Sequence, residues 1–368
     1  MMQVPMGMLG DKGCIRLAFM LNTISTILYW GSIAIVGSQQ NFPLWGFYFS
    51  PVFILIGGGP WVTGTLVFTA VSDSVKPEQR TAAFSIIEAT SGIADLLGPI
   101  IGTMTMSVHL GIPFSLALVV FFLMFFPASH LRESTVGNME GVASSQDETE
   151  SLLSVESAPD REEIDLEHTA RDLLTPGAVI FSTCFICFFF FQVARDSTNY
   201  LIPWVSLRFE ETMARAGLLL SLRAIMSSLL YFVILPLATS WIDHTWSSAN
   251  RDLTLSASGA FCCTLGTLVV AAAPNLATVA FGFALSVLGS SMTVTLRSFL
   301  ASYVENAFSG RLFAGISMTG TIGSLIGMPI MGAAYSLSIN CNIGLPFLVS
   351  ALSYFLVLGL LVWLVSKI

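Results

Sequence analysis

Three ionisable side chains lie inside long apolar stretches of this chain, where a charge is costly. Glu88 and Asp95 are seven residues apart within the stretch 80–107, and Arg223 lies ten residues into the stretch 213–239. A charge at the centre of a membrane helix costs about 2.5–3.5 kcal/mol on insertion scales, so such a residue is usually paired or functional. Positions seven apart share one helix face and lie about 10 Å apart along its axis. These residues predict two kinds of chemistry: an ion pair and proton binding by a carboxylic acid.

The two acids have different expected roles. Arg223 is expected at the membrane depth of Asp95, so the two residues form an ion pair if their helices are neighbours, which the family resemblance given below implies. The sequence offers no charged partner for Glu88, and Arg297, near a helix end, is expected to snorkel toward water. Burial favours the protonated form of a carboxylic acid, whereas a nearby arginine favours the ionised form. Glu88 is therefore the better candidate for a coupled proton, and a purely structural ion pair is the alternative.

A second polar group interrupts the apolar stretch 174–207, in the segment "FFFFQVARDSTNYLIPW". We expect these side chains to line a substrate cavity. In the alternative, two neighbouring charges satisfy one another at a helix break before Pro203. The residues concerned are Gln192, Arg195, Asp196, Asn199 and Tyr200.

Composition fixes the class of protein. Hydrophobic residues make up 54% of the chain and charged residues 10%, whereas soluble domains carry about 25% charged residues. About twenty apolar residues cross the roughly 30 Å hydrocarbon core as a helix. The chain is therefore predicted to be an all-α polytopic membrane protein. The expected spans are 15–37, 44–72, 80–107, 111–130, 174–207, 213–239, 254–273, 276–304, 310–338 and 343–367.

One long connection separates two groups of spans. Residues 131–173 contain twelve acidic residues and three arginines, which gives a net charge of −9, and they are too polar to fold alone. We predict an N-terminal bundle at 1–130, a disordered acidic linker at 131–173 and a six-helix bundle at 174–368. Within the linker, Glu148 precedes Leu152 and Leu153 at the spacing of an acidic dileucine sorting signal. The alternative is that this short match has arisen by chance.

Basic residues are distributed unevenly between the two sides of this arrangement. Only Arg208 and Arg215 lie on one side. The positive-inside rule therefore places both termini and the linker in the cytoplasm. The residues on the cytoplasmic side are Lys12, Arg16, Lys76, Arg80, Arg132, Arg161, Arg171, Arg251, Arg311 and Lys367.

The two halves also contain matching landmarks. Arg80, Pro99 and Gly102 correspond to Arg311, Pro329 and Gly332 at offsets of 231, 230 and 230 residues. "GIPF" at 111–114 and "GLPF" at 344–347 follow at an offset of 233, and Asp11 corresponds to Asp243 at 232. Offsets this constant indicate an internal repeat whose two copies run in the same direction.

Parallel repeats joined by a long cytoplasmic linker resemble the major facilitator superfamily. The family motif, Gly-x-Leu-x-Asp-Arg/Lys-x-Gly-Arg/Lys-Arg/Lys, is matched by Gly7, Leu9, Asp11, Lys12 and Arg16 in "GMLGDKGCIR", with Cys14 and Ile15 as departures. The motif belongs to the loop after the second helix. The resemblance therefore implies the major facilitator fold, in which each of the two bundles has six transmembrane helices (6 + 6). This chain would supply four helices of the first bundle and six of the second (4 + 6), and would lack the first two helices of the first bundle. It also implies a cytoplasmic gate of Asp11, Lys12, Arg16, Arg80, Asp243, Arg251 and Arg311.

Further stretches, such as "LIGGGPWVTGTLVFTAVSDSVKPEQRTAAF", are similar to fungal facilitators distantly related to the proton-coupled folate transporter family. The resemblance implies a proton-coupled secondary transporter of a small organic solute; the alternative is a non-transporting membrane protein or scaffold. No metal-ligand cluster, phosphate loop or nucleophile motif is present, so we expect no enzyme, metal or cofactor. The expected partners are the lipid bilayer, the transported solute and protons, and no nucleic acid is expected to bind. We expect a monomer, located in a vacuolar, endosomal or plasma membrane.

Overall fold

The computed structural model describes residues 2–12, 14–38, 48–76, 79–106, 111–129, 176–242, 248–304, 308–339 and 344–367. Within these ranges the chain is almost entirely helical and has no strand, which confirms the all-α class. The predicted linker, with Glu148, Leu152 and Leu153, lies outside the described residues, and so does Asp243.

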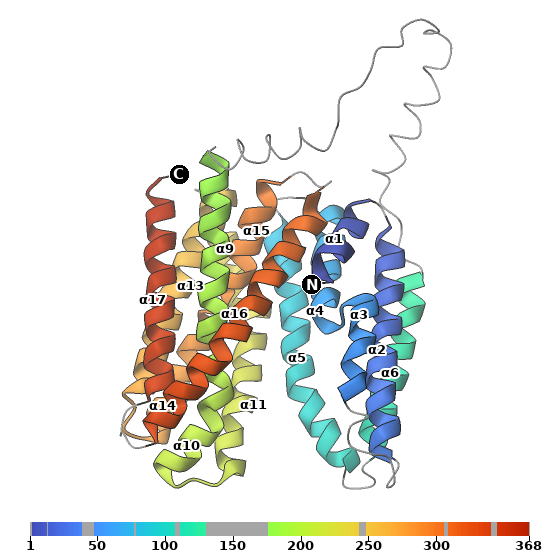
Figure 1. The fold of residues 1–368 in the computed structure, drawn as a ribbon. Coiled ribbons are helices and arrows are strands. Elements are labelled where there is room, and N and C mark those ends of the chain that lie inside the picture. The colour runs from blue at the N-terminus through green and yellow to red at the C-terminus, as the bar shows by residue number, and fades with distance from the viewer. Residues whose placement is uncertain are drawn as a thin grey trace, which may run out of the picture.

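The first group of helices contains the motif at its beginning. α2 packs against α3, α4 and α6, and α1 packs against α2 and α4 (Figure 1, blue to cyan). The helices are α1 (Gln3–Asp11), α2 (Ile15–Ser38), α3 (Ser50–Gly57), α4 (Pro60–Ser74), α5 (Arg80–Met106) and α6 (Ile112–Ser129).

The expected span 44–72 is divided into α3 and α4 by the segment "GGGP". Gly58 and Gly59 have φ angles of +82° and +66°, which side chains strongly disfavour, and Pro60 then begins α4. Asn22 of α2 donates hydrogen bonds to the carbonyl oxygens of Gly57 (2.9 Å) and Gly59 (2.7 Å). The broken helix therefore keeps its carbonyl groups satisfied inside the bundle.

The second group of helices runs from green to red in Figure 1. α13 packs against α14, α15 and α17, and α9 packs against α16 and α17. Two segments depart from α-helical geometry: the 3₁₀ segment η3 (Asp196–Tyr200) and the π-helical turn η4 (Leu230–Ile234). The helices are α9 (Pro176–Arg195), α10 (Leu201–Phe209), α11 (Met213–Leu229), α12 (Leu235–Ile242), α13 (Ser248–Ala271), α14 (Leu276–Leu288), α15 (Ser291–Ser302), α16 (Ser309–Ser338) and α17 (Leu345–Val365).

Each expected span coincides with one helix or with consecutive helices of the described chain. Nine of these segments are long and apolar enough to cross a membrane, and α6 is a shorter apolar helix. The difference that matters for the site is at α13, which begins at Ser248 rather than at 254, so that Arg251 and Asp252 lie inside the helix.

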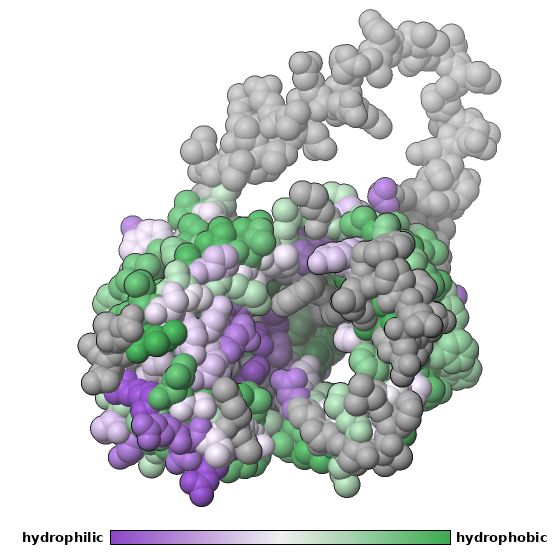
Figure 2. All heavy atoms as spheres, turned by 60° about the horizontal axis from the view of Figure 1, so that its bottom comes forward, coloured by the Kyte–Doolittle hydropathy of each residue, from purple (hydrophilic) through white to green (hydrophobic). Residues whose placement is uncertain are grey.

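The two bundles contact one another where α2, α5 and α16 begin, and we call this the closed end. There α16 packs on α1 and α4, and α5 packs on α15; farther from this end, α5 also packs along η4 and α11 of the second bundle. Phe68 of α4, Phe84 of α5 and Phe313 of α16 form a ring cluster with centroids 5.1–5.9 Å apart. At the opposite end, which we call the open end, the surface is hollowed between the bundles (Figure 2).

Two glycines allow α1 and α16 to touch at the closed end. A Cβ atom on Gly7 would lie 2.5 Å from the carbonyl oxygen of Gly310, and one on Gly310 would overlap the carbonyl oxygen of Gly7. Backbone on both sides of the contact cannot yield as a flexible side chain can. The absence of side chains at these two positions therefore sets the spacing of the bundles.

We predict that Gly7→Ala destabilises the protein, because overpacking of this kind costs about 1–3 kcal/mol and exceeds the roughly 1 kcal/mol gained in helix propensity. The thermal unfolding midpoint of the purified chain measures the effect. Gly10→Ala is the matched control on the same helix, since its Cβ would meet its nearest neighbour, Thr69, at an ordinary 3.7 Å. A midpoint for Gly7→Ala equal to or above that of Gly10→Ala would contradict the close approach.

Candidate functional site

A cavity with a volume of about 130 Å³ lies between α5 of the first bundle and the second bundle. This is room for roughly four water molecules at the density of liquid water. Hydroxyl groups and apolar rings alternate on its walls, and hydrophilic side chains are visible inside the hollow in Figure 2. The lining residues that carry charge are Glu88, Asp95, Arg195 and Arg223.

Asp95 and Arg223 face one another across the cavity, as the sequence predicted. The Asp95 Oδ2 and Arg223 Nη2 atoms are 3.8 Å apart and link α5 to α11. The distance is too long for a hydrogen bond, and the side chains are 66% and 32% exposed. The predicted ion pair therefore exists, but it is an open, cavity-facing pair rather than a buried one.

Glu88 has a charged partner that the sequence analysis missed. Its Oε1 atom accepts a hydrogen bond from Arg297 Nη1 at 2.8 Å, and the two side chains are 27% and 21% exposed. The Arg297 guanidinium also lies over the Phe68 ring, 4.4 Å from its centroid. Arg297 therefore does not snorkel toward water; it joins the second bundle to the first.

The Glu88–Arg297 pair stands at the inner limit of the cavity. Glu88 lines the cavity itself, whereas Arg297 lines a second space of about 120 Å³ toward the closed end. Thr65 and Ser317, from different bundles, lie on this second space and share a hydrogen bond of 2.7 Å. A carboxylate that the cavity reaches therefore holds a contact between the bundles.

The polar side chains of the stretch 174–207 face two different parts of the molecule, the cavity and helix α16. Arg195 lines the cavity, whereas Gln192 and Asp196 face α16, where Asp196 Oδ1 accepts hydrogen bonds from Gln192 and Ser324 at 3.2 Å. The Tyr200 hydroxyl donates to the carbonyl oxygen of Met328 on the same helix. Asn199 is exposed and does not line the cavity. Of the five predicted lining residues, only Arg195 is therefore in place, because the side chains of one helix point in all directions.

Asp11 binds the first residues of α16, in agreement with a gate role. Asp11 Oδ1 and Oδ2 accept hydrogen bonds from the backbone amides of Gly310 (2.6 Å) and Arg311 (3.0 Å). A carboxylate at a helix N-terminus also interacts favourably with the helix dipole. Burial raises the pKa of Asp11, and the two amide hydrogen bonds and the charge of Arg311 oppose this rise. Asp11 therefore ties the first bundle to the second.

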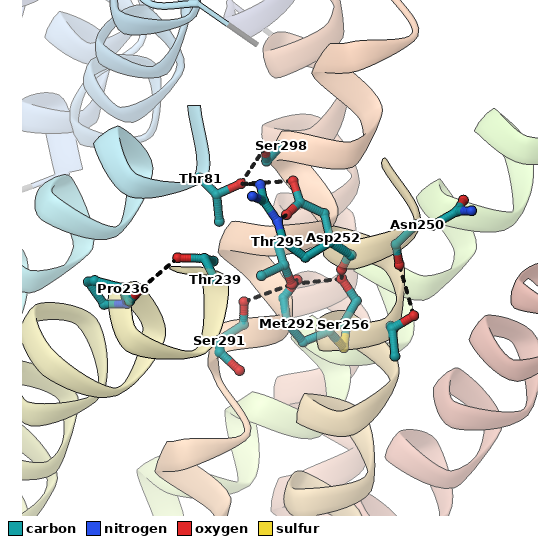
Figure 3. Close-up of polar contacts among 12 residues, drawn as sticks. Thr81, Pro236, Thr239, Asn250, Asp252, Ser256, Ser291, Met292, Thr295 and Ser298 are labelled. Atoms are coloured by element: carbon teal, nitrogen blue, oxygen red, sulfur yellow. Dashed lines mark hydrogen bonds and ion pairs between the residues drawn. The ribbon is translucent and has the colours of Figure 1, made fainter. Parts of the chain in front are cut away.

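A second buried contact closes the same end of the molecule. Thr81 of α5 donates a hydrogen bond to Asp252 Oδ2 and lies 2.8 Å from the Ser298 hydroxyl (Figure 3). Asp252 is paired with Arg251 through a 3.0 Å contact, and the Arg251 side chain is only 1% exposed. Arg80 donates to the carbonyl oxygen of Ala301. The charges buried at this end of the molecule are thereby paired or hydrogen-bonded.

The other predicted gate residues make weaker contacts between the bundles or lie away from that interface. Arg311 adds a 3.5 Å ion pair with Asp11, and Lys12 is exposed, while Arg16 is half-buried. Sequence analysis missed Thr81, Asp252 and Ser298. Asp252 lies before residue 254, where the span was expected to begin, so its burial inside α13 carries no signal in the sequence. Among the described residues, no group of three or more His, Cys, Asp or Glu could hold a metal ion.

Comparison with known proteins places these features in a family. The model of the Major Facilitator Superfamily matches residues 1–296. The efflux pump ustT of Aspergillus flavus is 27% identical over 79% of this chain and 59% of its own length. The chain thus spans little more than half of that relative. The transporter SAT21 of Stachybotrys chartarum is 27% identical over 97% of this chain and 80% of its own.

A solved structure shows the same fold. The transporter FucP in its outward conformation superposes with a TM-score of 0.67 and 14% identity, covering 98% of this chain and 86% of that one. At this identity the likeness concerns the architecture alone.

We predict that the two ion pairs contribute unequally to stability. Double-mutant cycles with Glu88→Gln and Arg297→Gln, and with Asp95→Asn and Arg223→Gln, measure each coupling from thermal unfolding midpoints. The hydrogen-bonded Glu88–Arg297 pair should couple by about 1.5–3 kcal/mol, and the long, exposed Asp95–Arg223 pair by less than about 1 kcal/mol. Equal couplings, or a larger one for Asp95–Arg223, would be incompatible with these geometries.

Proposed function

The chain belongs to the Major Facilitator Superfamily, and we propose that it is a secondary active transporter of a small organic solute. The proposal rests chiefly on the polar cavity, which both bundles line and which ends at a sealed interface between them. In this family parallel repeats rock around a site near the middle of the membrane. The alternative of a scaffold depends on the acidic linker and has no observation in its favour among the described residues.

The described conformation corresponds to one half of such a cycle. The closed end carries Lys12, Arg80 and Arg311, which the positive-inside rule assigns to the cytoplasm. The hollow in Figure 2 would then face the exterior or the lumen of a compartment. Export is the proposed direction, because a relative in the comparison is named an efflux pump.

Glu88 is the proposed proton carrier, because its surroundings connect the cavity with the closed end. A proton that enters from the cavity would neutralise the carboxylate and end its ion pair with Arg297. The bundles would lose a direct link, and the closed end would be free to part. Proton binding and opening of the closed end are thereby coupled through one side chain.

The protein is an integral multi-pass membrane protein. A vacuolar or endosomal membrane is the proposed location if Glu148, Leu152 and Leu153 form a sorting signal, and the plasma membrane if they do not. Either membrane carries the proton gradient that the proposed mechanism uses.

Transport can be tested with two membrane-impermeant fluorescent probes, naphthalene-1-sulfonate and trimethyl(1-naphthylmethyl)ammonium. We predict that proteoliposomes with the full chain move at least one of them when a pH gradient is imposed. Glu88→Gln should reconstitute normally and lose the dependence on the gradient, because an amide cannot exchange the proton.

The matched control is Glu211→Gln, which changes a surface partner of Arg215 outside the cavity. It should retain gradient-driven movement. Movement of neither probe by the unmodified chain would count against the transporter, and unaltered pH dependence of Glu88→Gln would remove Glu88 as the carrier.

A further inference from the structure

Arg195 is a cation in the cavity whose guanidinium has no ion-pair or hydrogen-bond partner within the described ranges. It lies 18 residues into the 33-residue span Gly177–Phe209, near the middle of the membrane. An arginine at this depth is costly unless something compensates its charge. Its side chain is exposed to the cavity, so water or a bound solute supplies its hydrogen-bond partners.

The neighbouring Asp196 does not provide this partner. Consecutive helical residues point about 100° apart, so adjacent side chains do not face one another. Asp196 Oδ1 is engaged by Gln192 and Ser324, and its Oδ2 atom is buried without a hydrogen-bond partner among the described residues, beside Gly327. Asp196 therefore interacts with Arg195 by charge attraction at a distance, without a hydrogen bond, while its carboxylate faces α16.

The other charges of the cavity balance each other. Asp95 faces Arg223, and Glu88 is bound by Arg297 from the closed end. Among the described residues Arg195 has no such ion-pair partner, and it lies close enough to Arg223 for the two guanidinium groups to repel. Two arginines therefore line the cavity, and the guanidinium of Arg195 offers a solute N–H donors that no other described residue engages.

The walls of the cavity add a site for an apolar body. Phe191, Phe283 and Val287 line it, and Tyr354, whose ring packs on Phe191 with centroids 5.6 Å apart, also faces it. Thr198, one turn after Arg195, adds a hydroxyl group to the same lining. The combination suits a flat apolar molecule with an anionic group at one edge.

We propose that the solute is an organic anion, whose carboxylate or sulfonate binds Arg195 while its apolar part packs against Phe191 and Phe283. This inference rests on the proposed transport function, because it concerns the same cavity. A neutral solute leaves Arg195 uncompensated, and a cationic one is repelled by it. A guanidinium binds a carboxylate or sulfonate with two parallel hydrogen bonds, which a lysine cannot reproduce.

Equilibrium binding to the purified full chain tests this proposal without requiring transport. The probes are naphthalene-1-sulfonate, the neutral naphthalene-1-sulfonamide and trimethyl(1-naphthylmethyl)ammonium. The sulfonate should bind at least about tenfold more tightly than the other two, as a charge-assisted hydrogen bond allows. In Arg195→Gln this preference should disappear, and in Arg195→Lys it should be partly kept.

Arg215→Gln is the matched control, since it removes the same charge from an exposed position outside the cavity. It should keep the full preference. Equal binding of the three probes, failure of the sulfonate to bind, or a preference that survives in a folded Arg195→Gln would overturn the proposal. A chain that binds the sulfonate through Arg195 but moves no probe would contradict the transport function alone.

Discussion

The ion pair between Glu88 and Arg297 is the contact on which the arrangement of the two bundles depends most directly. It connects α5 to α15 at 2.8 Å, at the level where the cavity ends and the aromatic cluster of Phe68, Phe84 and Phe313 begins. Both side chains are mostly shielded from water, so removing one charge leaves the other without its ion-pair partner in low-dielectric surroundings, which is energetically costly. The same pair therefore joins the bundles at the closed end, and it is the link that the proposed proton binding would release.

At the closed end, the equivalent helices of the two repeats, α5 and α16, each contact the opposite bundle. α5 begins at Arg80, and its counterpart in the repeat, Arg311, lies in the first turn of α16; the first turn of each helix meets the opposite bundle. At α16 the contact is made by the Asp11 carboxylate, and at α5 by Arg80 and Thr81 against Ala301 and Asp252. Such polar contacts can be exchanged for water when the bundles part, which a purely apolar interface could not do at equal cost.

Much of this architecture could be predicted from the sequence, because apolar length and charge placement are local signals. The spans and the common membrane depth of Asp95 and Arg223 follow from them, whereas the contact between these two helices and the position of Asp11 at a gate are implied by the family resemblance. The partner of Glu88 could not be predicted: Arg297 is 209 residues away, and its rotation about its helix is set by tertiary packing. For the same reason Gln192, Asp196 and Tyr200 were placed in the cavity although they face α16, and Asp252 was missed because α13 begins early.

The central claim, that Glu88–Arg297 holds the closed end shut, is tested most directly by distances between spin labels. In a cysteine-free background, labels at Ser74 and Tyr303 report on the closed end, and labels at Met106 and Arg215 report on the open end; these four residues are exposed. Glu88→Gln should lengthen the first distance and shorten the second, whereas Glu211→Gln should change neither. Distance distributions of Glu88→Gln that superimpose on those of the unmodified chain would contradict the account.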